Sequence, residues 1–470
     1  MEFFALLTAA TIMIAILALV VCLKRGDVGV LVGSAALYYW SLFGAWFIVM
    51  DKSGLTNGLF YYQYLERKLF PVLLDANYKL ALELYTVFQI AVLLTLLAAV
   101  KPPRLRPLPR LVLRHDAILF TSMLAGVASF LLIRGALSTA WALHTSAYAY
   151  TRTQPSAWFS LHQILNRVAL IPSAVGFATL IAGERSRYFV NVHRRYTLAG
   201  YAVLFAGMGT FTFVLGNKNE VLMALITGLL AYLGSVRRPH LLKVGMTLLA
   251  GLWFLYTIDT FRGVSIPDME TTLVEKLNST TEVSRFLTAS NEWYEAHVSM
   301  YGVLAGNIEP RFGYSFYSLA CSVIPRVIWP SRPPDIYVYY SEQVGAIQDQ
   351  GYTVNHATGW YLNFGVAGVV LGGVVLGLVW AFCLNAARRI DLKSGLPFRL
   401  FAAAAPWLFP ACLPALIRAG PEAYKGFVIE GVLIPLGILL LACRPKRAKR
   451  RVPATGGRWA MEPVPVRGNR

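Results

Sequence analysis

Charge is scarce in this chain: only 14% of its 470 residues are charged, whereas 56% are hydrophobic. A soluble protein of this length would carry nearly twice as much charge, so the composition excludes a soluble globular protein. Apolar stretches of roughly 20 residues, the length that crosses a bilayer, recur along nearly the whole sequence. Together with a mean hydropathy of +0.54, they predict an all-α polytopic membrane protein.

Cysteine is also rare, with five residues in the chain. Four of them fall in or beside apolar segments, and Cys321 is alone in the predicted outer loop, so no disulfide framework is predicted. No cluster of His and Cys has the spacing of metal ligands, and no Gly-rich loop has the pattern that cradles phosphates. We therefore expect neither a metal nor a cofactor.

The basic residues follow the apolar segments in a regular way. Lys and Arg are concentrated in alternate connections, from Lys24 and Arg25 to the tail that begins at Arg444, as the positive-inside rule requires. This pattern explains the net charge of +19 without a nucleic-acid partner. It predicts an outer N-terminus and a cytoplasmic C-terminus, with a tail suited to anionic membrane lipid. About eleven membrane helices are predicted, at residues 2–23, 28–50, 78–100, 116–138, 161–183, 196–216, 220–236, 243–262, 356–385, 396–418 and 427–443.

One long polar stretch divides the chain. We expect four parts: N-terminal membrane helices in 1–262, a long outer loop in 263–355, C-terminal helices in 356–443 and a basic tail in 444–470. The first apolar segment has no basic residue before it, the reverse of a signal peptide, so we expect it to remain as a helix. Loosely helical spacing in the loop predicts short helices there. Residues 314–329 are too short to span the membrane and suit an interfacial piece.

The most informative segment of the loop is Ile-Pro-Arg-Val-Ile-Trp-Pro-Ser-Arg-Pro-Pro, residues 324–334. Its prolines stiffen the backbone, and Trp329 suits a membrane interface. Arg326 and Arg332 offer planar forks of donors that fit phosphate or carboxylate. Because the positive-inside rule disfavours basic residues on this side, these two arginines are candidates for function.

Other basic residues lie at the outer ends of predicted helices. Lys218 and Arg418 stand at such ends, where a charge is costly unless it faces a cavity or a partner. Arg134, Arg167 and Arg262 are candidates for lining the same cavity. Arg262 is three residues from Asp259, and a pair so spaced is also typical of an ordinary ion pair within one helix.

Three segments carry a resemblance to a known family. Residues 324–333 are similar to an I-P-x-x-[IL]-W-P-x-[RK]-P element, and residues 215–220 are similar to a Gly-x-Arg element in which Lys218 replaces the usual arginine. Residues 417–420 are similar to a late loop arginine element. With this order, the chain resembles the bacterial oligosaccharide repeat-unit polymerases, the Wzy-type enzymes that build O-antigen, enterobacterial common antigen and exopolysaccharides.

This resemblance implies an activity and a location. It implies a GT-C-like fold in the bacterial inner membrane and a metal-independent, inverting glycosyl transfer at its periplasmic face. Undecaprenyl-diphosphate-linked glycans would be donor and acceptor, and a chain-length regulator and a flippase would be partners. The leaving diphosphate needs fixed cations, for which Arg326, Arg332, Arg418 and Lys218 are the candidates. The attacking hydroxyl gains from a base, for which His356 and Glu422 are named.

The sequence leaves three alternatives open. An O-antigen ligase differs only in its acceptor, which the sequence does not identify. A GT-C glycosyltransferase with a polyprenyl-monophosphate donor usually has an acidic pair in its first outer loop, whereas Asp51, Glu66 and Asp75 are well separated here. A lipid-linked oligosaccharide flippase or transporter would favour internal repeats, and none is apparent in this sequence.

Overall fold

The structure is a computed structural model that describes most of the chain. Three candidates from the sequence, Glu66, Arg262 and Arg326, lie outside the described residues, as does the basic tail beyond Pro445. The described residues are 2–52, 75–102, 110–152, 156–183, 186, 189–236, 241–261, 264–265, 268, 292–322, 324, 328–345, 353–389, 394–418 and 420–445.

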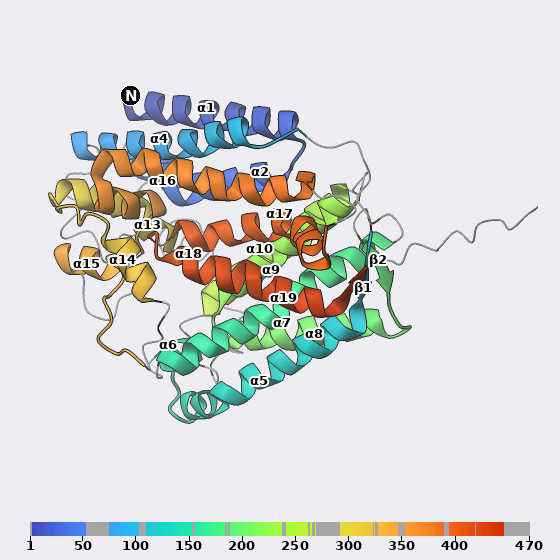
Figure 1. The fold of residues 1–470 in the computed structure, drawn as a ribbon. Helices are drawn as coiled ribbons and strands as arrows, with labels where there is room; N and C mark the ends of the chain where they lie inside the picture. The colour runs from blue at the N-terminus through green and yellow to red at the C-terminus, as the bar shows by residue number, and fades with distance from the viewer. Residues whose placement is uncertain are drawn as a thin grey trace, which may run out of the picture.

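Helices dominate these ranges, and every predicted membrane segment forms one (Figure 1). The physical reason is that an apolar segment in a bilayer satisfies its backbone polar groups only within its own helix or in a closed barrel. In chain order the main helices are α1 (Glu2–Arg25), α2 (Gly29–Tyr38) with the π-helical η1 (Tyr39–Phe43) and α3 (Gly44–Lys52), α4 (Ala76–Ala99), α5 (His115–Ala142), α7 (Ser156–Ala182), α8 (Thr197–Val214), α9 (Lys218–Ser235), α10 (Leu241–Phe261), α16 (His356–Arg389), α17 (Leu396–Ile417), and α18 (Ala423–Lys425) continuing through the π-helical η3 (Gly426–Leu433) into α19 (Ile434–Ala442).

Nine helices in the described part of the chain are long and apolar enough to cross a membrane. The polytopic helical class is therefore confirmed, while the predicted number was about eleven. The difference lies in α9 and α10. The first turn of α9 carries Lys218 and Glu220, and α10 contributes only the shorter apolar stretch Val244–Ile258.

Shorter helices lie in the connections. These are α6 (Ala147–Arg152), α13 (Glu292–Ala305), α14 (Tyr314–Cys321) and α15 (Ile336–Gln343). The last three belong to the stretch predicted as a long loop with short helices. Of the interfacial piece predicted at 314–329, the first half is α14, and Arg332 follows in a segment without regular structure.

A small sheet departs from the all-helical prediction. Strands β1 (Leu111–Arg114), β2 (Phe189–Val192) and β3 (Cys443–Pro445) form it in the order β2-β1-β3, with β1 parallel to β2 and antiparallel to β3. The strands have only three or four residues each, too few to show a period-2 pattern in the sequence. They pair only because the helices bring these connections to the same end of the bundle.

The helices form a layered bundle with α17 inside it. Helices α1 and α4 lie along one edge, and α5 and α8 lie along the opposite edge (Figure 1). Helix α17 packs against α16, α9 and α2, and 94% of the residues in its most apolar stretch are buried. It is therefore the central element, and its last residue, Ile417, leads directly into the candidate residue Arg418.

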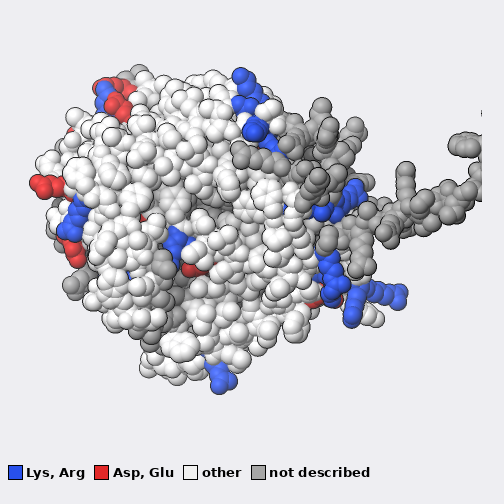
Figure 2. Space-filling model, viewed as in Figure 1, with Lys and Arg blue, Asp and Glu red and all other residues white. Residues whose placement is uncertain are grey.

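The two ends of the bundle differ in composition. Figure 2 shows Lys and Arg gathered at the end that carries β1 and β2 in Figure 1, whereas the end with α13 and α15 shows both signs of charge. This distribution is the spatial form of the alternation in the sequence. It supports, as a prediction, a cytoplasmic sheet end and an outer face formed by α13–α15.

Reporter fusions test this topology. A reporter fused after Gly313, which precedes α14, is expected to be active outside the cytoplasm. A reporter fused after Arg389, at the end of α16, is expected to be active in the cytoplasm. Paired alkaline phosphatase and fluorescent-protein fusions at both positions give the measurement. Both positions on the same side would contradict the predicted orientation.

Candidate functional site

Arg418 connects the end of the central helix to two distant segments. It follows α17 directly, and its Nη1 donates a hydrogen bond of 3.2 Å to Oδ1 of Asn219. Its guanidinium carbon lies 5.9 Å from the ring centroid of Trp40, within reach of a cation–π interaction. Asn219 belongs to the first turn of α9, next to Lys218, with which α9 begins. The fold thus joins two of the segments that carry the family resemblance.

The turn between α8 and α9 explains how Asn219 reaches Arg418. Gly216 has φ +63°, a backbone conformation that favours glycine, and it reverses the chain between the two helices. Lys218 and Asn219 therefore emerge at the same end of the bundle as Arg418.

Arg167 lies between two carboxylates from other elements. It is part of α7 and forms ion pairs with Glu430 of η3 and with Glu220 of α9, the latter at 3.5 Å. The exposed fractions of the side chains are 11% for Arg167, 3% for Glu220 and 24% for Glu430. Such a buried triad fixes the relative positions of α7, α9 and η3, because separating any pair would leave an uncompensated charge.

Arg332 and Lys425 meet at one backbone carbonyl. Nη1 of Arg332 donates to the carbonyl oxygens of Ser322 and Ile324, each at 3.1 Å. Nζ of Lys425 donates to the same oxygen of Ser322. Two cations are therefore held side by side, and Lys425 also interacts electrostatically with Glu430. Hydrogen bonds and electrostatic interactions thus link Arg332 in the loop to Arg167 in α7.

We call Arg167, Arg332, Arg418 and Lys425, with Glu220 and Glu430, the cation cluster; Arg418 is linked to the others only through Asn219, which precedes Glu220 in α9. It has four basic and two acidic members, and Asp335 also interacts electrostatically with Lys425. Charged atoms are visible near α18 in the middle of a face whose other charges lie toward its edges (Figure 2). Charges at such positions are expensive unless they face a cavity or a ligand. The arrangement suits a multiply charged anion such as a diphosphate.

Both π-helical segments contribute to this region. Trp40 belongs to η1 and Glu430 to η3. π-helical turns are rare overall, and those that occur are often found at functional sites. The hydropathy of the sequence gave no indication of either segment.

Lys425 and Glu430 were not named as candidates from the sequence. Glu430 lies inside the predicted helix 427–443, and an ionisable residue within a membrane helix is itself an indication of function. Lys425 lies in the last outer connection, 419–426, where the positive-inside rule disfavours a lysine. Both indications were present in the sequence.

Of the predicted diphosphate ligands, Arg332 and Arg418 are in the cation cluster, and Lys218 is adjacent to Asn219. Arg326 lies outside the described residues, as does Arg262. Of the predicted cavity-lining residues, Arg167 is in the cluster, whereas Arg134 is on α5 and lines a separate groove between α5 and α8.

His356 occupies a closed position. His356 is 0% exposed, and its Nε2 accepts a hydrogen bond of 3.1 Å from Nε1 of Trp360. The hydroxyl of Tyr424 lies 3.2 Å from the same nitrogen. Because Trp360 can only donate, Nε2 is the unprotonated nitrogen in this arrangement. These contacts join α16 to α18. Nε2 therefore already has hydrogen-bond partners within the protein.

Glu422 lies between α17 and α18 and reaches α15. Its Oε1 accepts a hydrogen bond of 3.0 Å from the backbone N–H of Ile336, the first residue of α15. Its other oxygen, Oε2, is buried. Burial raises the pKa of the Glu422 carboxyl above its ordinary value. Ser315 and Ile336 both donate hydrogen bonds to this carboxyl, and a raised pKa is one property that a general base needs.

The raised pKa of Glu422 predicts a pH dependence of stability. The folded protein binds this proton more tightly than the unfolded chain, so the free energy of unfolding falls as pH rises from 4.5 through the raised pKa, and then levels off. Glu422→Gln retains an acceptor for Ile336 and is expected to reduce this fall. Thermal unfolding between pH 4 and 8 gives the measurement, with the exposed Glu342→Gln as control. An unchanged pH profile in Glu422→Gln would contradict the expectation.

Among the described residues, no group of three or more His, Cys, Asp and Glu could hold a metal ion. No protein-family model, curated protein or solved structure matches the chain. What the fold establishes is the class: a polytopic helical membrane protein. The site adds a partly buried cation cluster built from five separate regions of the chain, at 167, 220, 332, 418 and 425–430.

Proposed function

We propose that this protein is a glycosyltransferase that polymerises lipid-diphosphate-linked oligosaccharide repeat units at the outer face of the bacterial inner membrane. The observation that carries the proposal is the cation cluster. It places Lys425 within electrostatic reach of Arg332 and links Arg418 to Glu220 through Asn219, and its basic groups suit the negative charge of a diphosphate. The resemblance of three sequence segments to the Wzy-type polymerases supplies the reaction.

The reaction assigns roles to three of the cations and to Glu422. A hydroxyl of the incoming repeat unit attacks the anomeric carbon of the growing glycan, with inversion. The bond between that carbon and the diphosphate oxygen breaks, and undecaprenyl diphosphate leaves with the electron pair. Arg332, Arg418 and Lys425 stabilise the negative charge on the leaving group where it develops. Glu422 takes the proton of the attacking hydroxyl.

A reconstituted assay tests this function. Purified protein is incubated with a chemically defined undecaprenyl-diphosphate-linked repeat unit, and the products are separated by size. We expect a ladder of products that differ by one repeat unit. Transfer only to an added lipid A core would indicate a ligase instead. Translocation of the lipid across vesicles without any ladder would indicate a flippase. Partners such as a chain-length regulator would change the ladder's length and not its existence.

Chelation tests the proposed metal independence. If fixed cations neutralise the leaving diphosphate, excess EDTA is expected to leave the rate of ladder formation unchanged. The measurement is the initial rate with and without EDTA, followed by added magnesium or manganese. Loss of activity with EDTA and recovery with either metal would favour a metal-dependent mechanism of the polyprenyl-monophosphate class.

A further inference from the structure

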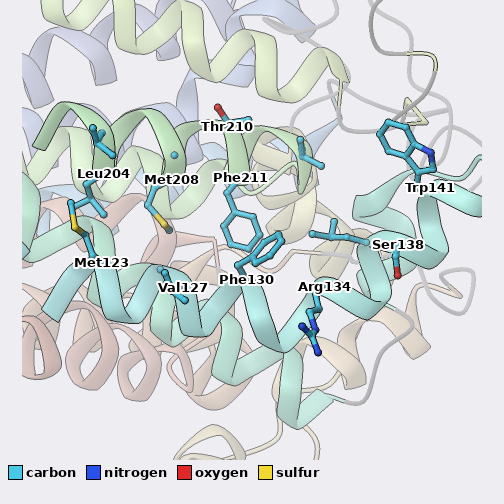
Figure 3. A pocket seen from close by; sticks show the side chains of 15 residues that line it. Met123, Val127, Phe130, Arg134, Ser138, Trp141, Leu204, Met208, Thr210 and Phe211 are labelled. Atoms are coloured by element: carbon cyan, nitrogen blue, oxygen red, sulfur yellow. The ribbon is translucent and has the colours of Figure 1, made fainter. Parts of the chain in front are cut away.

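An apolar groove runs along the edge of the bundle between α5 and α8, apart from the contacts that define the cation cluster. Its volume is about 1130 Å³, at the upper limit of sites for drug-sized ligands. Met123, Val127 and Phe130 of α5 face Leu204, Met208 and Phe211 of α8 across it (Figure 3). Phe130 and Phe211 meet with ring centroids 5.9 Å apart.

Two glycines shape the groove between α5 and α8. Gly126 of α5 and Gly207 of α8 both line the groove. A Cβ on Gly126 would lie 2.8 Å from Sδ of Met208, so the helices approach closely there. A Cβ on Gly207 would meet nothing within 4 Å, so the groove is open at that point. Gly126 thus allows α5 and α8 to approach each other closely, whereas the absence of a side chain at Gly207 leaves the groove open at that position.

One end of the groove is polar. Arg134, Ser138 and Trp141 of α5 follow the aromatic pair toward the end of the helix (Figure 3). Arg134 is exposed, and no described residue forms a hydrogen bond or ion pair with it. It is eight residues from the end of α5, about 12 Å at the rise of an α-helix. Its long side chain can therefore extend to headgroup depth.

We propose that this groove binds one anionic glycerophospholipid, with its phosphate on Arg134 and an acyl chain along the Phe130–Phe211 floor. A cation within a membrane helix needs a partner, and a phosphodiester supplies one. A single arginine balances the single charge of a phosphodiester. A diphosphate carries more charge and matches the multiple cations of the cluster better. Trp141 suits the headgroup level.

Native mass spectrometry after purification in mild detergent provides the test. Phosphatidylglycerol and phosphatidylcholine of equal chain length are each added, and the protein fraction with one bound lipid is measured. We expect phosphatidylglycerol to be retained, and phosphatidylcholine to be retained about tenfold less, because a charge-assisted bond to the phosphate of phosphatidylglycerol lacks the competing choline cation. This comparison needs only the native sequence.

Two variants localise the site. Arg134→Gln removes the phosphate ligand, and Gly207→Leu fills the open groove. Both are expected to lower retention of phosphatidylglycerol about tenfold or more. Their matched controls are Arg195→Gln, an exposed arginine, and Gly245→Leu, where a Cβ also meets nothing within 4 Å. Both controls are expected to retain the lipid as the native protein does.

Three results would overturn the proposal. They are equal retention of the two lipids, unchanged retention in Arg134→Gln, and displacement of phosphatidylglycerol by an equimolar amount of undecaprenyl phosphate. The last would assign the groove to the isoprenoid chain. None of these depends on the polymerase assay, so this proposal and the proposed function stand or fall separately.

Discussion

Replacement of Arg418 by alanine is expected to lower the rate of polymer formation by at least about 100-fold, the usual effect of removing one preorganised electrostatic donor. Arg418 directly follows α17, the most buried membrane helix. Its guanidinium is positioned by Asn219 and Trp40. Alanine removes the charge without altering that helix. The measurement is the initial rate of the ladder assay on purified, correctly inserted protein.

Two further variants define the role of Arg418. Arg418→Lys retains the charge and is still expected to lose much of the activity, because an ammonium does not reproduce the planar fork of donors. Arg195→Ala, at an exposed position before α8, is the control and is expected to be fully active. Full-length polymer from Arg418→Ala would remove this residue from the site.

Replacement of Arg167 by alanine is expected to affect stability as well as activity. It leaves Glu220 and Glu430 without their shared partner. Removing one member of a buried ion pair costs about 3–5 kcal/mol, which is a large part of the stability of most proteins. We expect a lower unfolding temperature and a smaller fraction of monodisperse protein in size-exclusion chromatography.

A compensated variant separates the two effects of Arg167. The triple replacement Arg167→Met with Glu220→Gln and Glu430→Gln removes all three charges together. It is expected to recover most of the lost stability, because no unpaired charge remains, and to recover polymer formation with it, because Arg332, Arg418 and Lys425 are retained. Arg167→Ala with native stability would show that the triad does not hold α7, α9 and η3 together.

The membrane helices were predictable because each depends on its own composition. A segment such as α4 or α17 satisfies its backbone hydrogen bonds within itself, so a run of apolar residues is enough to indicate it. The small sheet was missed for the opposite reason. Its strands pair across residues 111, 189 and 443, and nothing within three or four residues indicates a partner so distant in the chain.

The candidate site was predictable in part. Arg332 and Arg418 could be named because topology does not require basic residues where they lie. The sequence could not show which of the other ionisable residues near them contribute to the site. Whether an ionisable residue forms an ion pair, caps a helix or faces a ligand depends on which elements meet, as His356 and Glu422 illustrate.

By itself, then, the sequence determined the class of this protein, the positions of its helices and the charge asymmetry of their ends, because these depend on local hydropathy and on the distribution of Lys and Arg. Only the tertiary structure decided that Arg167 lies between Glu220 and Glu430, that Arg332 and Lys425 share the carbonyl of Ser322, and that Arg134 stands apart at a groove. The physical reason is that these contacts join residues tens to hundreds of positions apart, and helix packing, not local propensity, brings them together.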